Sequence, residues 1–182
     1  KKSKKILEAG RGAPTAVNAQ PQRILVLDTP EDLNKVKEFC TFGWKQKYVD
    51  LAEERDTANH KHIVIYYGAP LVLMVCYDKK ACWKHPESGV SSGQTDVVIV
   101  ATHMMLEAVS LGLETAWINY FDEQKARKSL HLPDDWQPVC MLYIGYPVDD
   151  YQPNPNLSAR RKPLTETCFL TKSPANAYKN TV

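Results

Sequence analysis

The longest apolar stretch of the chain has no polar face. In segment 96–111 only three of the sixteen side chains are ionisable, and apolar residues fall on every side of the helix that the spacing predicts. We expect a central helix that is covered on all sides, which in so small a chain invites a partner subunit. Thr95 or Asp96 would accept its first free backbone N–H groups, and Gly112 would end it in a left-handed turn.

Periodic patterns predict the remaining elements. The clearest helix begins after Thr29, with Pro30 at its first position, acidic residues in its first turn and an apolar inner stripe that ends at Cys40. A short charged helix over 122–130 would be capped by Asp122. Further helices are predicted over 4–11 and 44–58, and strands over 23–28, 63–67, 70–77, 115–119 and 139–144.

Three segments lack such periodicity. Residues 13–21 hold two prolines and small polar side chains, which indicates an ordered loop that leads into a strand. Residues 78–94 form a long loop before the central helix, and long loops in small domains are often functional. Residues 145–163 hold four prolines and little apolar content, so we expect an extended arm. We interpret 1–170 as one domain whose arm covers 145–168, followed by a loose tail over 171–182.

Composition narrows the classes of function. The chain has 23 Lys and Arg against 21 Asp and Glu, so its net charge of +2 argues against binding to nucleic acid. No apolar stretch is long enough for a membrane span or a signal peptide, and we expect no membrane partner. The five cysteines are an odd number without a Cys-x-x-Cys pair, which fits a reducing compartment. We therefore expect a cytoplasmic protein.

One group of residues could be interpreted as a metal or nucleophile site. Cys82 and His85 lie close in sequence, with His60 and His62 upstream. A metal site needs further ligands at suitable spacing, and a Cys–His nucleophile needs a third group that orients the histidine. Neither is visible, so we expect no metal and no nucleophile pair here.

Three motifs together resemble the nitroreductase family of FMN-dependent oxidoreductases. ILEAGRGAPTAVNAQP, residues 6–21, is similar to the family's first helix and loop, and DVVIVATHMMLEAVSLGLETAWI, residues 96–118, to its central helix and following strand. LYIGYP at 142–147 with RRKPL at 160–164 is similar to its closing segment. The resemblance covers most of residues 4–168, and the first two motifs, in that order and spacing, are its specific part.

The resemblance implies a fold, a cofactor and a partner. The fold would be α+β, with layers as in α/β proteins: a central mixed, mainly antiparallel sheet flanked by helices, in a homodimer with FMN at the subunit interface. Trp83 would be a stacking wall over the flavin ring, with simple loop packing as the alternative, and Lys84 would lie near the nicotinamide nucleotide. The implied cofactor-binding residues are Pro14, Thr15, Asn18, Gln20, Thr115, Trp117 and Ile118, with Arg161 and Arg160 on the phosphate.

The implied chemistry has two half-reactions at one site. NAD(P)H, the co-substrate, gives a hydride to the flavin and leaves, and a nitroaromatic, quinone or similar small acceptor then takes the electrons. Because the cofactor carries this chemistry, we expect no catalytic side chain. The alternatives are a flavin-binding dimer that is non-catalytic or regulatory, a family member that performs reductive dehalogenation or oxidative breakdown of the flavin, or an α/β scaffold without a cofactor.

The start of the sequence departs from the family pattern. Members normally carry an Arg-x-Ser-x-Arg element well before the first helix, where it also binds the phosphate. Here KKSKK runs directly into ILEAGR, so Lys2, Ser3 and Lys5 match the composition of that element but not its spacing. These residues are therefore left out of the expected cofactor site.

Overall fold

The chain divides into two compact units, Lys1–Pro147 and Val148–Val182, and each is described by itself. A computed structural model describes residues 1–40, 69–147 and 155–169. The predicted helix over 44–58, the predicted strand over 63–67 and the tail over 171–182 lie outside the described residues.

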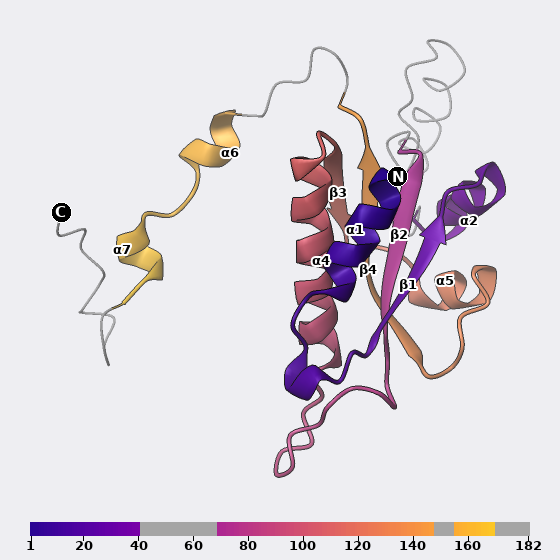
Figure 1. Ribbon diagram of the computed structural model, residues 1–182, viewed down its shortest axis with the longest axis horizontal. Coiled ribbons are helices and arrows are strands. Elements are labelled where there is room, and N and C mark those ends of the chain that lie inside the picture. The colour runs from indigo at the N-terminus through magenta and orange to yellow at the C-terminus, as the bar shows by residue number, and fades with distance from the viewer. Residues whose placement is uncertain (41–68, 148–154, 170–182) are drawn as a thin grey trace. The chain divides into compact units, whose positions relative to one another are not determined.

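A four-stranded sheet forms the middle layer of the first unit (Figure 1). Its order is β1-β2-β4-β3, and each of the three ladders is antiparallel, so within the described residues the expected mixed sheet is antiparallel throughout. Each predicted strand in the described residues is present. The strands are β1 (Gln22–Leu27), β2 (Leu71–Asp78), β3 (Glu114–Ile118) and β4 (Trp136–Gly145).

The last strand begins earlier than the predicted 139. Between Val75 and Cys76 the register of β2 against β4 shifts, so that Cys76 pairs with Pro138 and Val139 is left as the extra residue of a bulge. A proline lacks the N–H that a regular ladder needs but is tolerated at a bulge. The strand therefore continues through a residue that we took as its boundary.

Alternation along the central strands divides the core into two clusters. Val72, Met74 and Cys76 of β2 face one way, and Leu73 and Val75 face the other, and none of these five side chains is more than 1% exposed. Since both faces of the sheet are apolar, each must be covered by helices. The helices α2 (Pro30–Cys40) and α5 (Glu123–Ser129) cover the first face, and α1 (Lys2–Arg11) and α4 (Gly93–Ser110) cover the second (Figure 1).

The two helices of the first face are capped as predicted. The Asp32 backbone N–H donates to Thr29 Oγ at 3.2 Å, and the Lys125 backbone N–H donates to the Asp122 carboxylate at 3.0 Å. Side-chain caps of this kind satisfy backbone donors that have no partner within the helix. The predicted inner stripe of α2 is buried: Leu33, Val36, Phe39 and Cys40.

The central helix α4 begins three residues earlier than predicted. Its Gly93 N–H donates to Ser91 Oγ at 3.1 Å, so the prediction that Thr95 or Asp96 caps the helix is wrong. Asp96 is used instead to hold another segment of the chain. Gly112 follows the helix with φ of +73°, a left-handed conformation that glycine adopts without strain, and this prediction is confirmed.

The outer side of α4 carries exposed apolar side chains in the part of the chain that the structure describes. Val98 is 37% exposed, Leu106 61% and Val109 51%. On the inner side α1 lies close to α4. A Cβ on Gly10 would lie 2.7 Å from Met104 Cγ, so a larger residue there would force the Met104 side chain to shift. The expected cover on all sides is therefore absent from one copy of the described chain. We call Val98, Leu106 and Val109 the apolar strip.

The second unit contains two short helices, α6 (Pro155–Ala159) and α7 (Leu164–Thr167), within the arm that we expected to be extended. Prolines caused this error: Pro155 is the first residue of α6 and Pro163 is the N-cap of α7, positions where a missing N–H costs nothing. Among the described residues of the whole chain, no helix is long and apolar enough to cross a membrane.

Candidate functional site

The loop over residues 13–21 is held in an uncommon backbone conformation. Val17, Asn18 and Gln20 have φ of +47°, +57° and +50°, which is rare for residues other than glycine and occurs where surrounding contacts enforce it. Thr15 Oγ accepts the Gln20 N–H at 3.1 Å, and the Ala16 N–H donates to Asp96 Oδ1 at 2.9 Å. The loop therefore has a shape that hydrogen bonds fix from inside and from α4.

This loop displays polar and apolar groups together. Pro14, Asn18 and Gln20 are exposed, Thr15 is half-buried, and Val17 is 75% exposed. An Asn or Gln side chain offers both donors and an acceptor, so this set can bind a flat ring that has alternating polar edge groups. The loop thus brings together all four of the predicted residues that lie in it.

Asp96 joins the loop to the start of α4. It is 3% exposed, and among the described residues it is the one charged side chain that is buried. Ser92 Oγ donates to Asp96 Oδ2 at 2.7 Å, while Ala16 holds the other oxygen. A carboxylate in the first turns of a helix is also stabilised by the helix dipole. In the sequence, Asp96 is one of the three ionisable residues of an apolar helix, and it is not among the predicted cofactor-binding residues.

The predicted loop over 78–94 is largely an ordered hairpin. Backbone N–H groups of Ser92 and His85 donate to the carbonyls of Trp83 and Val90, each at 2.9 Å, and a bridge pairs Lys84 with Ser91. We call residues 79–92 the hairpin; it extends from the end of α4 where that helix begins (Figure 1). Backbone bonds hold this element, and residues 78–94 show no apolar alternation from which it could be predicted.

An open hollow of about 470 Å³ lies between the loop 13–21, the hairpin and the start of α4. The Trp83 ring stands edge-on to the His85 ring with centroids 5.8 Å apart. Lys84 is exposed and does not line this hollow. The structure therefore brings Trp83, but not Lys84, to the predicted cofactor loop, and it adds His85. The lining residues are Ala16, Trp83, His85, Ser88, Val90, Ser91, Ser92, Thr95 and Asp96.

Cys82 and His85 do not contact each other in a catalytic arrangement. Cys82 Sγ lies 3.0 Å from Ser91 Oγ, and His85 Nδ1 accepts the backbone N–H groups of Glu87 and Ser88 at 3.3 and 3.2 Å. Both side chains therefore brace the hairpin. Across the described ranges, no three His, Cys, Asp or Glu residues are grouped so that they could hold a metal ion.

Three other cysteines are buried in the sheet and its cover. Burial raises the pKa of the Cys40 thiol to about 11, and that of Cys76 and of Cys140 to about 12. A thiol with so high a pKa is protonated at neutral pH and is a poor nucleophile. These cysteines are part of the core and do not contribute to the site.

The predicted site residues of β3 lie on an edge strand. Thr115, Trp117 and Ile118 are half-buried, and β3 pairs with β4. The loop 13–21 leads into β1, which is the opposite edge of the sheet. Because two strands lie between these edges, β1 and β3 are separated by about 14 Å at the usual strand spacing. One copy of the described chain therefore does not gather both groups of residues into one pocket.

The predicted phosphate ligands belong to the second unit. Arg160 and Arg161 have exposed side chains at the end of α6 and form no ion pair with other described residues. Both guanidinium groups are available to an anion.

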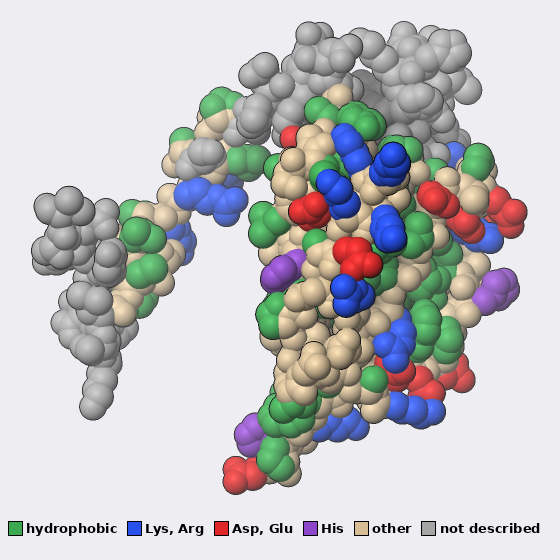
Figure 2. Space-filling view, in the orientation of Figure 1, with side chains coloured by type: hydrophobic (Ala, Val, Ile, Leu, Met, Phe, Trp, Pro, Cys, Tyr) green, Lys and Arg blue, Asp and Glu red, His purple; other side chains and the backbone are tan. Residues whose placement is uncertain are grey.

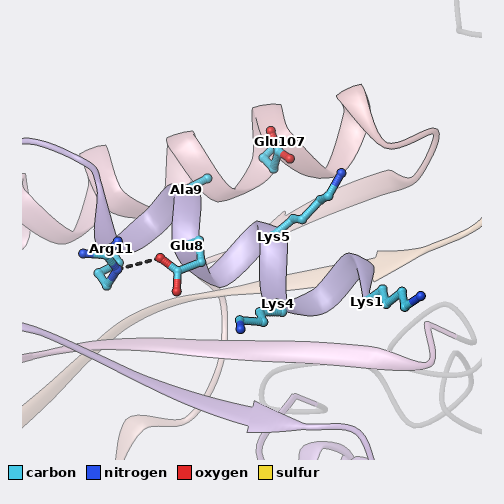
Figure 3. Close-up of a pocket in the computed structure, with 7 residues that line it drawn as sticks. All are labelled: Lys1, Lys4, Lys5, Glu8, Ala9, Arg11 and Glu107. Carbon is cyan, nitrogen blue, oxygen red and sulfur yellow. Dashed lines mark hydrogen bonds and ion pairs between the residues drawn. The ribbon is translucent and has the colours of Figure 1, made fainter.

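A second hollow, of about 680 Å³, runs along α1 under a cluster of basic side chains (Figures 2 and 3). Lys2 is used in the fold, since its Nζ donates to the Leu111 carbonyl at 2.7 Å and lies 4.7 Å from the centre of the Tyr146 ring. Arg11 pairs with Glu8 at 2.6 Å. The lining residues, shown in Figure 3, are Lys1, Lys4, Lys5, Glu8, Ala9, Arg11 and Glu107.

Comparison with known proteins gives one consistent family. The family model described as "Nitroreductase family" matches residues 2–146. A curated "NADH dehydrogenase" of Thermus thermophilus is 27% identical over 172 residues, which cover 87% of this chain and 82% of that protein.

Solved structures agree with this result. A nitroreductase family protein from Clostridium difficile 630 is 31% identical with a TM-score of 0.76, and the match covers 94% of this chain and 86% of the other. A protein from Exiguobacterium sibiricum 255-15, solved in complex with FMN, is 20% identical with a TM-score of 0.69, and the match covers 93% and 85%. At that identity the second likeness shows the fold alone.

Proposed function

The chain belongs to the nitroreductase family, and we propose from this premise that it is an FMN-dependent oxidoreductase that passes electrons from NAD(P)H to a small acceptor. When bound, FMN would accept a hydride from NAD(P)H and deliver the two electrons to a nitroaromatic, a quinone or a similar oxidant in a second half-reaction. The protein's task is to bind and orient the cofactor and both substrates.

The conformation of the loop 13–21 carries this proposal. Its left-handed residues are fixed by hydrogen bonds, and Asn18 and Gln20 are exposed, with no strong side-chain partner among the described residues. The pyrimidine edge of a flavin presents donors and acceptors that such amides can match, and Val17 offers apolar surface beside them. The residues present therefore fit the cofactor that the family implies.

The phosphate of FMN would be held by Arg161 together with Arg160. Both are exposed and free of ion pairs with other described residues, and a guanidinium offers a fork of donors that suits a phosphate.

The complete site would require two copies of the chain. The loop 13–21 leads into β1 and the other predicted residues lie on β3, so the two groups belong to opposite edges of one sheet, which are about 14 Å apart at the usual strand spacing. The apolar strip of α4 supplies a surface of the kind that homodimer interfaces bury. We therefore propose a homodimer with FMN at the interface, where the loop of one copy meets Thr115, Trp117 and Ile118 of the other.

The hairpin would form the wall on the substrate side. Trp83 and His85 line the hollow beside the loop 13–21, where a flat ring can stack or meet a ring edge. Lys84 is exposed outside this hollow and would attract the negatively charged nicotinamide nucleotide from solvent. No side chain is required as an acid or base in this proposal.

The first experiment is the visible absorption spectrum of the purified protein supplied with FMN, followed by anaerobic NADH and then NADPH in the same cuvette. Bound flavin that bleaches with either nucleotide supports the oxidoreductase. Bound flavin that stays yellow supports a flavin-binding protein without this activity. No bound flavin would contradict the proposal.

The phosphate contact has its own test. Arg161→Ala should weaken FMN binding by about 10- to 100-fold, because a hydrogen bond between charged groups contributes about 1.5–3 kcal/mol. Lys162→Ala is the matched control, since it removes an adjacent exposed cation of the same charge. Titration of apoprotein with FMN, followed by flavin fluorescence, gives both dissociation constants. Equal constants for wild type and Arg161→Ala would remove Arg161 from the site.

A further inference from the structure

We propose that Asp96 is a positioning residue of the site: its buried carboxylate locks the loop 13–21 to the hairpin, so that the two segments hold or lose their arrangement together. The description of the loop as a flavin site rests on the proposed function. The lock itself rests on the contacts of Asp96.

The two carboxylate oxygens serve two different segments. Oδ1 accepts the backbone N–H of Ala16, from a segment 80 residues earlier in the chain, and Oδ2 accepts the hydroxyl of Ser92 at the base of the hairpin. The distances of 2.9 and 2.7 Å are those of well-formed bonds. At 3% exposure Asp96 has little access to water that could replace either donor.

From Ser92 the connection reaches the hollow. The Ser92 backbone N–H donates to the Trp83 carbonyl at 2.9 Å, which fixes the strand of the hairpin that carries the aromatic wall. Trp83, Ser92, Asp96 and Ala16 all line the same hollow. Asp96 thus connects the segment that carries Trp83, through Ser92, with the turn that contains Asn18, through Ala16.

Bonds within the loop, such as that from the Gln20 N–H to Thr15 Oγ, keep its local shape, and the bond from the Ala16 N–H to Asp96 ties the loop to α4. Its three residues with positive φ are strained, and such strain persists when contacts around it enforce the conformation. Asp96 forms no ion pair with other described residues, so the donors that face its charge are the Ser92 hydroxyl, just before α4, and the Ala16 N–H of the loop. Removing the carboxylate leaves the Ala16 N–H without its acceptor. This lowers the free energy that is needed to open the loop to water.

The variants separate the lock from the charge. Asp96→Ala removes both acceptors. Asp96→Asn keeps both bonds, because its amide oxygen can accept from Ala16 and its amide nitrogen can donate to Ser92, whose hydroxyl is also an acceptor. Ser92→Ala cuts the connection to the hairpin alone. Val36→Ala is the control for general destabilisation, since Val36 is a fully buried residue of α2, on the opposite face of the sheet.

Two measurements are made on each variant: amide hydrogen exchange of the apoprotein, read in peptides that cover 13–21 and 82–92, and the dissociation constant for FMN. Asp96→Ala should speed exchange about tenfold or more in both peptides and raise the FMN dissociation constant about tenfold or more, the size expected for a lost hydrogen bond to a charged group. Asp96→Asn should stay within threefold of wild type. Ser92→Ala should affect the hairpin peptide more than the loop peptide.

Two results would overturn the lock. One is exchange in Asp96→Ala that rises in one peptide only, and the other is an effect on both peptides and on FMN that Val36→Ala reproduces. If Asp96→Ala does not fold, rescue by Asp96→Asn and the unequal effect of Ser92→Ala still decide the matter. If wild-type protein binds no FMN, the proposed function fails, and the exchange measurements alone decide whether Asp96 couples the two segments.

Discussion

The two faces of the sheet follow different rules. On the face covered by α2 and α5, apolar side chains point inward, and neither helix exposes a large apolar residue. On the face covered by α1 and α4, the main helix exposes the apolar strip to solvent and buries a carboxylate. The strand residues beneath the helices are equally buried on both faces. The difference between the faces therefore lies in the helices that cover them.

This contrast separates a face that has the features of a structural element from a face that has the features of a functional surface. On the face covered by α2 and α5, local helix propensity, helix capping and side-chain burial all favour the same structure, as expected for a structural element. The α4 face departs from these rules at the apolar strip, at Asp96 and at the left-handed loop, and such departures are typical of functional or partner surfaces. The proposed interface and the proposed cofactor loop both lie on this side.

The largest effect is expected on the structural face. Phe39 is fully buried, and its ring meets that of Phe121 edge-on with centroids 6.3 Å apart. Phe39→Ala should lower the free energy of unfolding by about 3–5 kcal/mol through the lost burial and the cavity left behind. Urea unfolding followed by circular dichroism measures this loss. The folded fraction of the variant should bind FMN like wild type, and a weaker affinity would show that the two faces are not separable.

A smaller effect is expected on the exposed side of α4. Leu106→Lys should leave the stability of the single chain nearly unchanged, because this side chain is 61% exposed. In the proposed homodimer it should weaken association by about 2 kcal/mol or more, as for other central apolar interface residues. Light scattering across a dilution series should show a monomer where wild type is a dimer, with FMN lost in parallel.

Val26→Lys is the matched control for Leu106→Lys. Val26 is an exposed apolar residue of the edge strand β1, at 39%, and it receives the same substitution outside the apolar strip. It should leave the dimer and the bound flavin intact. A wild-type protein that is monomeric at all concentrations while binding flavin would contradict the two-copy site.

Sequence patterns predicted the structural face nearly completely. The N-cap Thr29, the inner stripe of α2 and the cap Asp122 follow from local rules that act within one or two turns of helix, and all are confirmed. The family motifs also predicted the nitroreductase fold correctly. What was missed depends on contacts between distant residues.

Asp96 shows why those contacts were missed. Its position near the start of an apolar helix suggested a cap, but α4 begins at Gly93, so Asp96 lies within the first turn and its carboxylate accepts the N–H of Ala16, 80 residues away. The hairpin was missed for a similar reason, since its ladder is made by backbone groups that carry no side-chain pattern. Prolines explain two further differences from the prediction. In β4 a bulge tolerates Pro138, and in α6 the first helical position tolerates Pro155.

The smallest effect tests the capping of α2. Thr29→Ala removes the acceptor of the Asp32 N–H and the hydroxyl that donates to the Asp32 carboxylate at 2.7 Å. At neutral pH it should cost about 1 kcal/mol of stability, as for other N-cap threonines. Thr29→Ser is the control that keeps the hydroxyl and should cost less. Unfolding curves recorded from pH 7 down to pH 3 measure both variants.

The pH dependence of this cost separates its two parts. The hydrogen bond from Thr29 lowers the pKa of Asp32 in the folded protein, with Lys35 acting in the same direction and burial opposing it. A carboxylate whose folded pKa is depressed contributes stability above its unfolded pKa and loses it as pH falls through the folded value. The gap between wild type and Thr29→Ala should therefore narrow below about pH 4, and it should not vanish, because the bond from the Asp32 N–H does not titrate. A gap that stays constant to pH 3 would show that the Thr29 hydroxyl stabilises the helix through the backbone bond alone.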